Sequence, residues 1–562
     1  MGNLVPGVEA VRVEGRGRLP ARAEEGTGPA SGRAWRYLLG STLAVVALAW
    51  AVAVALQVAG GAYRNEFGGH SDEPGHYITG LMVRDYVAGL HWAHPARFAD
   101  DYYHHYPKVA LGHWPPVFYV VQAAWTLVFT PSRLSVLLLM AVLTAVWAGL
   151  LYRAVRADFG AGMGLAMALL LVLLPLVQQG TDLLMADTLT SLFCLGAVLC
   201  FGRFLDTGLW RSALAFGVVA SLAILTKGSG LVLGLVPLLA VVLSRRFGVL
   251  RRPAFWCVPL VVAVLCGPWC VATLGLAHNG FDRPSPALAF TIPALGFYGL
   301  GLVRITGIGL SAVAVLGLFV KVIRPWWHGG AEGKWATAAA LLIALLVFHG
   351  VVPVGFETRY LLPAAPLVLL FLAAGMAWLA ERLPARWPAP GRLAAVGVAV
   401  AFVFAVETFT IPGQPWYGFG PVAQELIAKP DLRGATLLVS SDPRGEGAFI
   451  AEVAAHEERP GHTVLRGSKL LAKDDWMGHG YEPLYRTQEA LTRRLEEAGV
   501  AVVVVDTSAP ESPDLEHHRL LLEALESDPA HWRLTSSGRL VRDRTDCPDA
   551  VRVYRYLAAT SR

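Results

Sequence analysis

The chain has 562 residues, of which 55% are hydrophobic and 16% are charged, and its mean hydropathy is +0.49. A soluble fold could not bury this much apolar surface, and the apolar residues come in runs of about 20. A soluble globular protein is therefore excluded, and the sequence indicates an α-helical protein that crosses a membrane several times. The net charge of +5 is no sign of a nucleic-acid partner, because Lys and Arg in such proteins report orientation.

The first 34 residues carry several arginines and are rich in Gly and Pro, which predicts a disordered cytoplasmic segment. This segment is too long for a signal peptide and lacks a cleavage site, so the first apolar run should stay in the membrane as an anchor. That run, residues 38–59, has no charged residue and is long enough to cross a hydrocarbon core of about 30 Å.

Placing the clusters of Arg and Lys in the cytoplasm predicts about eleven transmembrane helices, with the N-terminus inside and the C-terminus outside. The expected spans are, in chain order, residues 38–59, 134–151, 161–177, 183–201, 213–226, 231–243, 254–276, 305–320, 336–352, 361–380 and 393–409. One further apolar stretch, residues 114–125, is not counted as a span, because it would place the basic clusters on the wrong side of the membrane. Its Trp, Tyr, Gln and paired Pro favour an interfacial helix within the first outer loop, residues 61–133.

Residues 411–562 lose the long apolar runs and mix alternating with helical patterns. We expect buried strands at residues 435–440 and 500–506 and helices at residues 447–455 and 487–498, which together indicate a small α/β domain outside the membrane. The segment Asp442-Pro-Arg-Gly-Glu-Gly447 resembles a phosphate-binding turn but lacks the full glycine spacing. A plain turn between a strand and a helix is therefore expected there.

The most informative short feature is Asp72-Glu73, a carboxylate pair shortly after the first span. A carboxylate at the water edge of a bilayer can deprotonate a hydroxyl or amine acceptor and can hold a cation. Each ionisable residue near a span end has a bland explanation as a solvated loop residue or an interfacial anchor. Their gathering on one face instead indicates a site. The other ionisable residues expected on this outer face are His113, Asp182, Asp187, Lys227, His278, Asp282, Glu357 and Arg359.

Two cations in this group suit a phosphate. Lys227 lies in Leu225-Thr-Lys-Gly228 between two apolar runs, where a lysine must reach water or find an anion. A phosphate at the membrane surface would be such an anion, because Gly228 opens the next helix N-terminus toward it. Arg359 offers a planar fork for the same phosphate, although a pair with Glu357 explains it equally well in isolation.

The sequence gives little support for a metal site or for disulfide bonds. Seven of the sixteen histidines lie between His70 and His113, and His, Asp and Glu together can bind zinc, so a divalent metal ion stays an open alternative. No two of these histidines form a tight helical ligand pattern such as HExxH, and the sequence does not establish a cofactor. Only Cys547 lies outside the apolar runs, so neither a disulfide framework nor a cysteine zinc site is expected.

In chain order these segments resemble the membrane glycosyltransferases of the GT-C superfamily. The closest branch is the protein O-mannosyltransferase-like family, which includes the transferases that add aminoarabinose to lipid A. The matching segments, within roughly residues 35–410, are Ser71-Asp-Glu-Pro-Gly-His-Tyr77, His113-Trp-Pro-Pro-Val-Phe-Tyr119, Met185-Ala-Asp-Thr-Leu189, Leu225-Thr-Lys-Gly228 and Arg359-Tyr-Leu-Leu-Pro363. The aminoarabinose transferases often carry Glu-Lys before the paired prolines, where this chain has His113-Trp114.

The resemblance implies a donor in which a sugar is linked to a polyprenyl phosphate. The lipid would lie among the membrane lipids of a bacterial inner membrane, and the sugar-phosphate would be presented at the periplasmic face. The acceptor would be a lipid, a glycan or a protein, and transfer would proceed with inversion by direct displacement. The C-terminal α/β domain lies beyond the matching part of the chain.

The resemblance also assigns roles to residues. Asp72 would be the catalytic base, Glu73 would position the acceptor or a metal ion, and Asp187 would be a third catalytic carboxylate. Lys227 and Arg359 would stabilise the departing lipid phosphate. The further expected substrate contacts are His76, His113, Asp182 and Tyr360.

A transporter of a lipid-linked or small polar substrate is the alternative. It should show internal repeats and broken helices with polar residues near the middle of the bilayer. In this chain the charges gather at one face, and the long first loop has no counterpart in the second half. We therefore favour the transferase.

Overall fold

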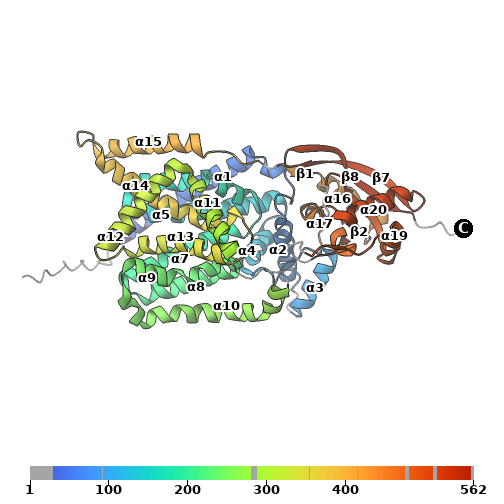
Figure 1. Ribbon diagram of the computed structural model, residues 1–562, viewed down its shortest axis with the longest axis horizontal. Coiled ribbons are helices and arrows are strands. Elements are labelled where there is room, and N and C mark those ends of the chain that lie inside the picture. Colours follow the sequence, from blue (N-terminus) through green and yellow to red (C-terminus); the bar gives the residue numbers. More distant parts are fainter. Residues whose placement is uncertain are drawn as a thin grey trace, which may run out of the picture.

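The structure is a computed structural model that describes residues 29–90, 93–279, 288–353, 355–413, 415–474, 480–509 and 515–557. It consists of a helical bundle and an α/β domain that lies at one end of the bundle (Figure 1). The long helices of the bundle run along the long axis of the molecule (Figure 1). This arrangement confirms the predicted class, a polytopic helical membrane protein with a C-terminal α/β domain.

Eight helices in the described part of the chain are long and apolar enough to cross a membrane, and α8 and residues 228–244 form shorter apolar helices. The helices of the bundle are α1 (Pro29–Ala59), α5 (Arg133–Leu173), α7 (Asp187–Thr207), α8 (Trp210–Thr226), η2 (Gly228–Gly234), α9 (Val236–Ser244), α10 (Pro253–Asn279), α11 (Leu288–Leu318), α13 (Gly333–Val351), η5 (Thr358–Ala364), α14 (Ala365–Arg382) and α15 (Ala389–Glu407).

Helix α5 is two helices that meet at Gly160, whose φ of 84° and ψ of 171° interrupt the helix. A Cβ added to Gly164 would lie 2.9 Å from the carbonyl oxygen of Tyr152, so the chain folds back on itself at this point. Adding the second arm of α5, α8 and residues 228–244 to the eight long helices gives eleven passages in the described chain. The expected number of spans is therefore confirmed.

Some boundaries differ from those expected. Helix α1 begins at Pro29, so residues 29–34 are helical, while residues 1–28 lie outside the described residues. A separate helix, α6 (Pro175–Asp182), follows the second arm of α5, because Leu174 is extended and Pro175 starts a new helix. Helix α7 begins at Asp187 rather than at residue 183, which places this carboxylate at a helix N-terminus, where the helix dipole favours a negative charge.

The first outer loop forms three helices between the bundle and the C-terminal domain, namely α2 (Glu73–Ala88), α3 (Pro95–His105) and α4 (Val117–Val128) (Figure 1). Helix α4 corresponds to the expected interfacial helix. It buries Phe118 and Tyr119 against the loop but exposes Val120, Leu127 and Val128. An exposed apolar edge of this kind suits contact with lipid at the membrane surface.

The C-terminal domain is built on a six-stranded sheet with the order β1-β7-β8-β6-β2-β3. The strands are β1 (Trp416–Tyr417), β2 (Thr436–Ser440), β3 (Thr463–Arg466), β6 (Val500–Asp506), β7 (Trp532–Arg542) and β8 (Thr545–Tyr556), with helices α16 (Phe419–Ile427), α17 (Pro443–His456), α19 (Gln488–Glu497) and α20 (Glu516–Ser527). Strand β2 pairs in parallel with β3 and β6, and the other pairs of this sheet are antiparallel. The strands and helices expected in this region are confirmed.

Helix α17 starts four residues earlier than expected, because Asp442 caps it. The Asp442 carboxylate accepts a hydrogen bond from the backbone N–H of Gly445 at 2.8 Å, and Pro443 occupies the first turn. A carboxylate therefore fills the place that a phosphate would take. The segment is a plain strand-to-helix turn, as expected.

The domain is fixed to the first outer loop by a shared apolar core and by one buried carboxylate. Phe67 and Tyr77 pack in the same cluster as Trp416 and Phe419. Glu66 accepts three hydrogen bonds of 2.8 Å from the backbone N–H groups of residues 418–420, at the N-terminus of α16. These donors have no partner within the helix, so Glu66 supplies their acceptor from another part of the chain.

Candidate active site

Asp72 and Arg359 form an ion pair at the end of the bundle that meets the C-terminal domain (Figure 1). Asp72 is the N-cap of α2, but its side chain does not cap that helix. Its Oδ2 instead accepts a hydrogen bond from Arg359 Nη2 at 2.9 Å. The backbone N–H of Asp72 donates to Nδ1 of His70 at 3.1 Å. Arg359 is carried by η5, the short 3₁₀ helix that precedes α14.

A second ion pair joins Lys227 to Asp187, with Nζ donating to Oδ1 at 2.6 Å. Both side chains are largely buried, at 13% and 6% exposure. Asp187 starts α7, whereas Lys227 ends α8 in extended backbone with φ −155° and ψ 140°. The break after α8 therefore aims Lys227 at the start of the neighbouring helix.

The ring of Tyr360 connects the two ion pairs. Its centroid lies 5.1 Å from Lys227 Nζ and 5.4 Å from Arg359 Cζ, so both cations interact with the aromatic face. The charges of the two pairs balance, and Glu357 adds a third carboxylate, with its Oε2 3.9 Å from Arg359 Nε. An incoming phosphate would compete with Asp72 and Asp187 for Arg359 and Lys227.

A cavity of about 460 Å³ opens beside these pairs, which is a typical size for a small-molecule site. Leu176, Leu183 and Leu362 give it an apolar part. The polar residues of its wall are Asn65, His70, Ser71, Gln179, Asp182, Asp187, Glu357, Thr358, Arg359, Arg444 and Asp543. The bundle, the first outer loop and the C-terminal domain all contribute to this wall.

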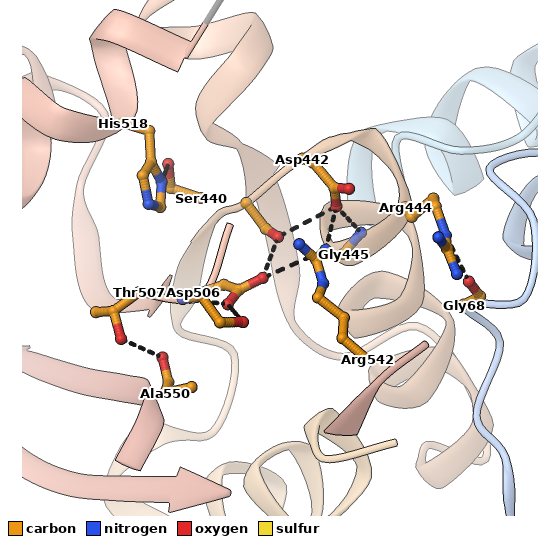
Figure 2. A network of polar contacts seen from close by, with 12 residues as sticks. Gly68, Ser440, Asp442, Arg444, Gly445, Asp506, Thr507, His518, Arg542 and Ala550 are labelled. Atoms are coloured by element: carbon orange, nitrogen blue, oxygen red, sulfur yellow. Dashed lines mark hydrogen bonds and ion pairs between the residues drawn. The ribbon is translucent and has the colours of Figure 1, made fainter. Parts of the chain in front are cut away.

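Arg444 and Asp543 bring the C-terminal domain into the site. Arg444 Nε donates to the carbonyl oxygen of Gly68 at 2.9 Å, and its Nη1 and Nη2 atoms bind both carboxylate oxygens of Asp543 at 2.8 and 3.1 Å. Figure 2 shows Arg444 turned toward Gly68, away from the polar network around Asp442 and Arg542. The loop, α17 and the β7–β8 hairpin therefore meet at the cavity wall.

Glu73 takes a different position from the one expected. Its side chain has no exposed surface, and Arg133 Nη1 donates to its Oε1 at 2.7 Å. The backbone N–H groups of Gly69 and Leu184 also donate to this carboxylate, each at 3.2 Å. Glu73 thus ties together α2, α5 and the segment before α7, and it is absent from the described wall of the cavity.

The expected substrate contacts divide into two groups. Asp182 lines the large cavity, and Tyr360 lies between the two cations. In contrast, His76 is buried in a stack with Trp114 at a centroid distance of 4.1 Å, and its Nδ1 lies 2.9 Å from the Tyr119 hydroxyl. Neither His76 nor His113 belongs to the described cavity wall.

These surroundings shift the pKa values of three side chains. Burial disfavours ionisation of Asp72, but the charge of Arg359 outweighs it and holds the pKa of this carboxyl well below its ordinary value. Burial raises the pKa of Asp182 to about 7, although Arg133 opposes the shift. Burial lowers the pKa of His76 to about 3, so this imidazole is neutral at physiological pH.

Reasoning from sequence missed several residues of the site. Arg444 and Asp543 lie far along the chain in ordinary surface patterns, which gave no signal. His349 carried one, because it is a single histidine within the apolar helix α13, and an ionisable residue inside a span often marks a site. Asp282, which was expected near the site, lies outside the described residues.

In the described part of the chain, no group of three or more His, Cys, Asp or Glu side chains is arranged to hold a metal ion. The divalent ion that the sequence left open therefore has no candidate ligand set among these residues. The ionisable groups that do converge form carboxylate–cation pairs. We derive the chemistry of the site from those pairs alone.

Comparison with known proteins agrees with this architecture. Residues 113–271 match the family model described as dolichyl-phosphate-mannose-protein mannosyltransferase, and this segment contains Asp182, Asp187 and Lys227. No curated protein matches the chain at a significant level.

Several solved structures share the fold. ArnT from Cupriavidus metallidurans bound to undecaprenyl phosphate is 15% identical with a TM-score of 0.58, and the match covers 92% of this chain and 98% of that one. The Archaeoglobus fulgidus oligosaccharyltransferase in the apo form is 13% identical with a TM-score of 0.55, covering 83% and 69%. AglB from the same organism, in complex with an inhibitory peptide and a dolichol-phosphate, is 12% identical with a TM-score of 0.52 and the same coverage. These matches confirm the fold that the sequence resemblance implies.

Proposed function

We propose that this chain, a multi-pass membrane protein with the GT-C fold, transfers a sugar from a polyprenyl-phosphate-linked donor to an acceptor at the outer face of the membrane. One observation carries the proposal. Asp72, Asp187, Lys227 and Arg359 come from four separate segments and converge as two ion pairs beside a single cavity at one end of the bundle. Structures of this fold with undecaprenyl phosphate and with dolichol-phosphate support the choice of donor class.

The donor phosphate would be held by Lys227 and Arg359. Both cations lie at breaks in apolar helices, and we infer that these breaks lie at the depth where a lipid phosphate meets the bilayer surface. Charge-assisted hydrogen bonds from an ammonium and a guanidinium would favour the phosphate more strongly after the bond to the sugar breaks, because the leaving group then gains negative charge. Asp187 orients Lys227 for this contact.

Transfer would proceed by a single inverting displacement. The acceptor oxygen or nitrogen attacks the anomeric carbon, the bond to the phosphate oxygen breaks, and the acceptor proton passes to a carboxylate. Asp72 is our first choice for this base, because it faces Arg359 and would gain basicity when the phosphate draws that cation away. Asp182 is the second choice, because it lines the cavity and its pKa is raised to about 7.

The active face would be extracytoplasmic, in the inner membrane of a bacterium. The basic residues Arg245, Arg246, Arg251 and Arg252 follow α9, at the end of the bundle away from the C-terminal domain (Figure 1). This excess of Arg would place that end in the cytoplasm. A reporter fused to the C-terminus should be active only outside the cytoplasm, and activity confined to the cytoplasm would reverse this orientation.

The proposal is tested with purified protein and radiolabelled polyprenyl-phosphate sugars, offered with a membrane extract as the acceptor source. Transfer should be seen with at least one donor and should fall strongly in Lys227→Ala, since a hydrogen bond to a charged group contributes about 1.5–3 kcal/mol. Lys429→Ala is the matched control, because it removes an exposed ion pair with Glu425 on the C-terminal domain. Absence of transfer, together with absence of binding to undecaprenyl phosphate, would overturn the proposal.

A further inference from the structure

His349 is a buried histidine for which the bundle provides no hydrogen bond. It lies near the end of α13 with 1% of its surface exposed, and neither ring nitrogen has a hydrogen-bond partner among the described residues. Its ring stacks on Tyr360 at a centroid distance of 5.1 Å and an interplanar angle of 5°. Buried polar atoms are almost always satisfied in folded proteins, so two open nitrogens on one ring require a reason.

The same place holds other polar atoms that lack a partner. Asp187 Oδ2 and the Nε and Nη1 atoms of Arg359 have no hydrogen bond among the described residues. Asp187, His349, Arg359 and Tyr360 all line one small cavity of about 10 Å³. A space of this size accommodates one oxygen-sized group. An apolar residue at position 349 would satisfy the packing of the bundle. The shared cavity instead indicates that these polar atoms bind a common ligand.

The charges around the cavity indicate the chemistry of this ligand. Asp72 and Asp187 already balance Arg359 and Lys227, and Glu357, 3.9 Å from Arg359, adds a further negative charge. A sugar phosphodiester carries one negative charge. When the acceptor's bond to the anomeric carbon forms and the bond to the phosphate oxygen breaks, the electron pair stays on that oxygen and the phosphate gains a second charge. The acceptor's proton goes to the carboxylate base, so the leaving phosphate needs another donor on its own side.

We propose that His349 is a further ligand of the lipid-carrier phosphate, donating a ring N–H to a phosphate oxygen that enters the small cavity. This inference rests on the proposed function, because it assumes a polyprenyl phosphate at Lys227 and Arg359. A histidine suits the role, since it is a neutral donor before transfer and can take a proton when the dianion forms. The ionisable groups that face its ring are Asp187 and Cys194 of α7, Lys227, Tyr298 of α11, and Arg359 and Tyr360 of η5.

Direct binding of undecaprenyl phosphate to the purified full-length chain tests the inference. His349→Gln keeps an N–H donor but cannot take a proton, and His349→Phe removes every donor while keeping a ring to stack on Tyr360. His517→Gln is the matched control. His517 is also buried, and its Nε2 has no partner in the described chain, but it lies in the C-terminal domain. Thermal unfolding of each variant shows whether it is folded.

We expect His349→Phe to weaken binding at least about tenfold, as for loss of a hydrogen bond to a charged group, and the control to bind like the wild type. The wild type should bind more tightly as the pH falls through the range in which imidazole takes a proton, and His349→Gln should lose that increment. Binding by both His349 variants that equals the wild type at every pH would overturn the inference. Failure of the wild type itself to bind would instead refute the proposed donor.

Discussion

The guanidinium of Arg359 holds the carboxylate of Asp72 at 2.9 Å, although 287 residues separate them in the chain. This contact explains why a residue at a helix N-cap does not cap its helix. It also keeps Asp72 ionised and weakly basic until another anion competes for Arg359. A donor phosphate is such an anion, so binding of the donor would itself raise the basicity of the carboxylate that must accept the acceptor's proton.

Asp72→Asn should therefore reduce transfer by about 10²–10⁴-fold, because the amide keeps the size of the side chain but cannot accept the proton. Asp182→Asn should cost much less. The measurement is turnover against pH in saturating donor. A wild-type rate that falls as the pH drops below about 7, together with loss of activity in Asp182→Asn alone, would move the role of base to Asp182.

Glu73→Gln should act on folding rather than on turnover. The change leaves Arg133 facing a neutral group in a buried site, and breaking a buried ion pair costs about 3–5 kcal/mol. We expect a clear drop in thermal stability in detergent, with the activity of the remaining folded protein nearly unchanged. Glu425→Gln, which breaks an exposed pair with Lys429, should leave stability within about 0.5 kcal/mol. A stable Glu73→Gln enzyme that has lost turnover would restore the catalytic role suggested by its position beside Asp72.

The sequence was sufficient to predict the number of spans, since apolar runs and basic clusters are local properties of the chain. It also placed Asp187 and Lys227 on the same face, because both fall at helix ends, but it did not predict the ion pair between them. The sequence could not predict that the side chains of Asp72 and Glu73 point to different partners. The direction of two adjacent side chains depends on Arg359 and Arg133, which arrive from distant segments.

The part played by the C-terminal domain was also beyond prediction from sequence. Arg444 reaches the cavity only because the shared apolar core and Glu66 dock the domain on the first outer loop. Such contacts between distant segments follow from tertiary packing, for which a single sequence carries no periodic signal.

Docking of this domain should weaken at high pH. Glu452 lies beside Glu66 in the docking interface, and burial together with the Glu66 charge raises its pKa to about 8 from an ordinary 4.5. The folded state thus binds this proton more tightly than the unfolded state does. The stabilisation is full below pH about 4.5 and is lost as the pH rises through about 8. Limited proteolysis between the bundle and the domain should accelerate across this range in the wild type. Glu452→Gln, which mimics the protonated form, should remove most of that dependence, and an unchanged dependence would contradict the assignment.

The C-terminal domain contributes Arg444 and Asp543 to the cavity wall, and we expect this side of the cavity to face the acceptor. Asp543 and Arg544 form the tip of the β7–β8 hairpin with φ values of 47° and 77°, which non-glycine residues seldom adopt. A two-residue hairpin loop of type I′ requires a positive φ at both positions, and this turn places Asp543 against Arg444 at the cavity wall. Because Arg444 and Asp543 bond to Gly68 and to each other rather than to Lys227 or Arg359, we expect Arg444→Ala and Asp543→Asn to reduce transfer to acceptors in a membrane extract severalfold while leaving the affinity for undecaprenyl phosphate unchanged. Arg539→Ala is the control, since it breaks an exposed pair with Asp546 on the same hairpin. If both wall variants transfer sugar like the control, the C-terminal domain does not contact the acceptor through this pair; if they lose donor affinity instead, the donor and acceptor halves of the cavity have been assigned in the wrong order.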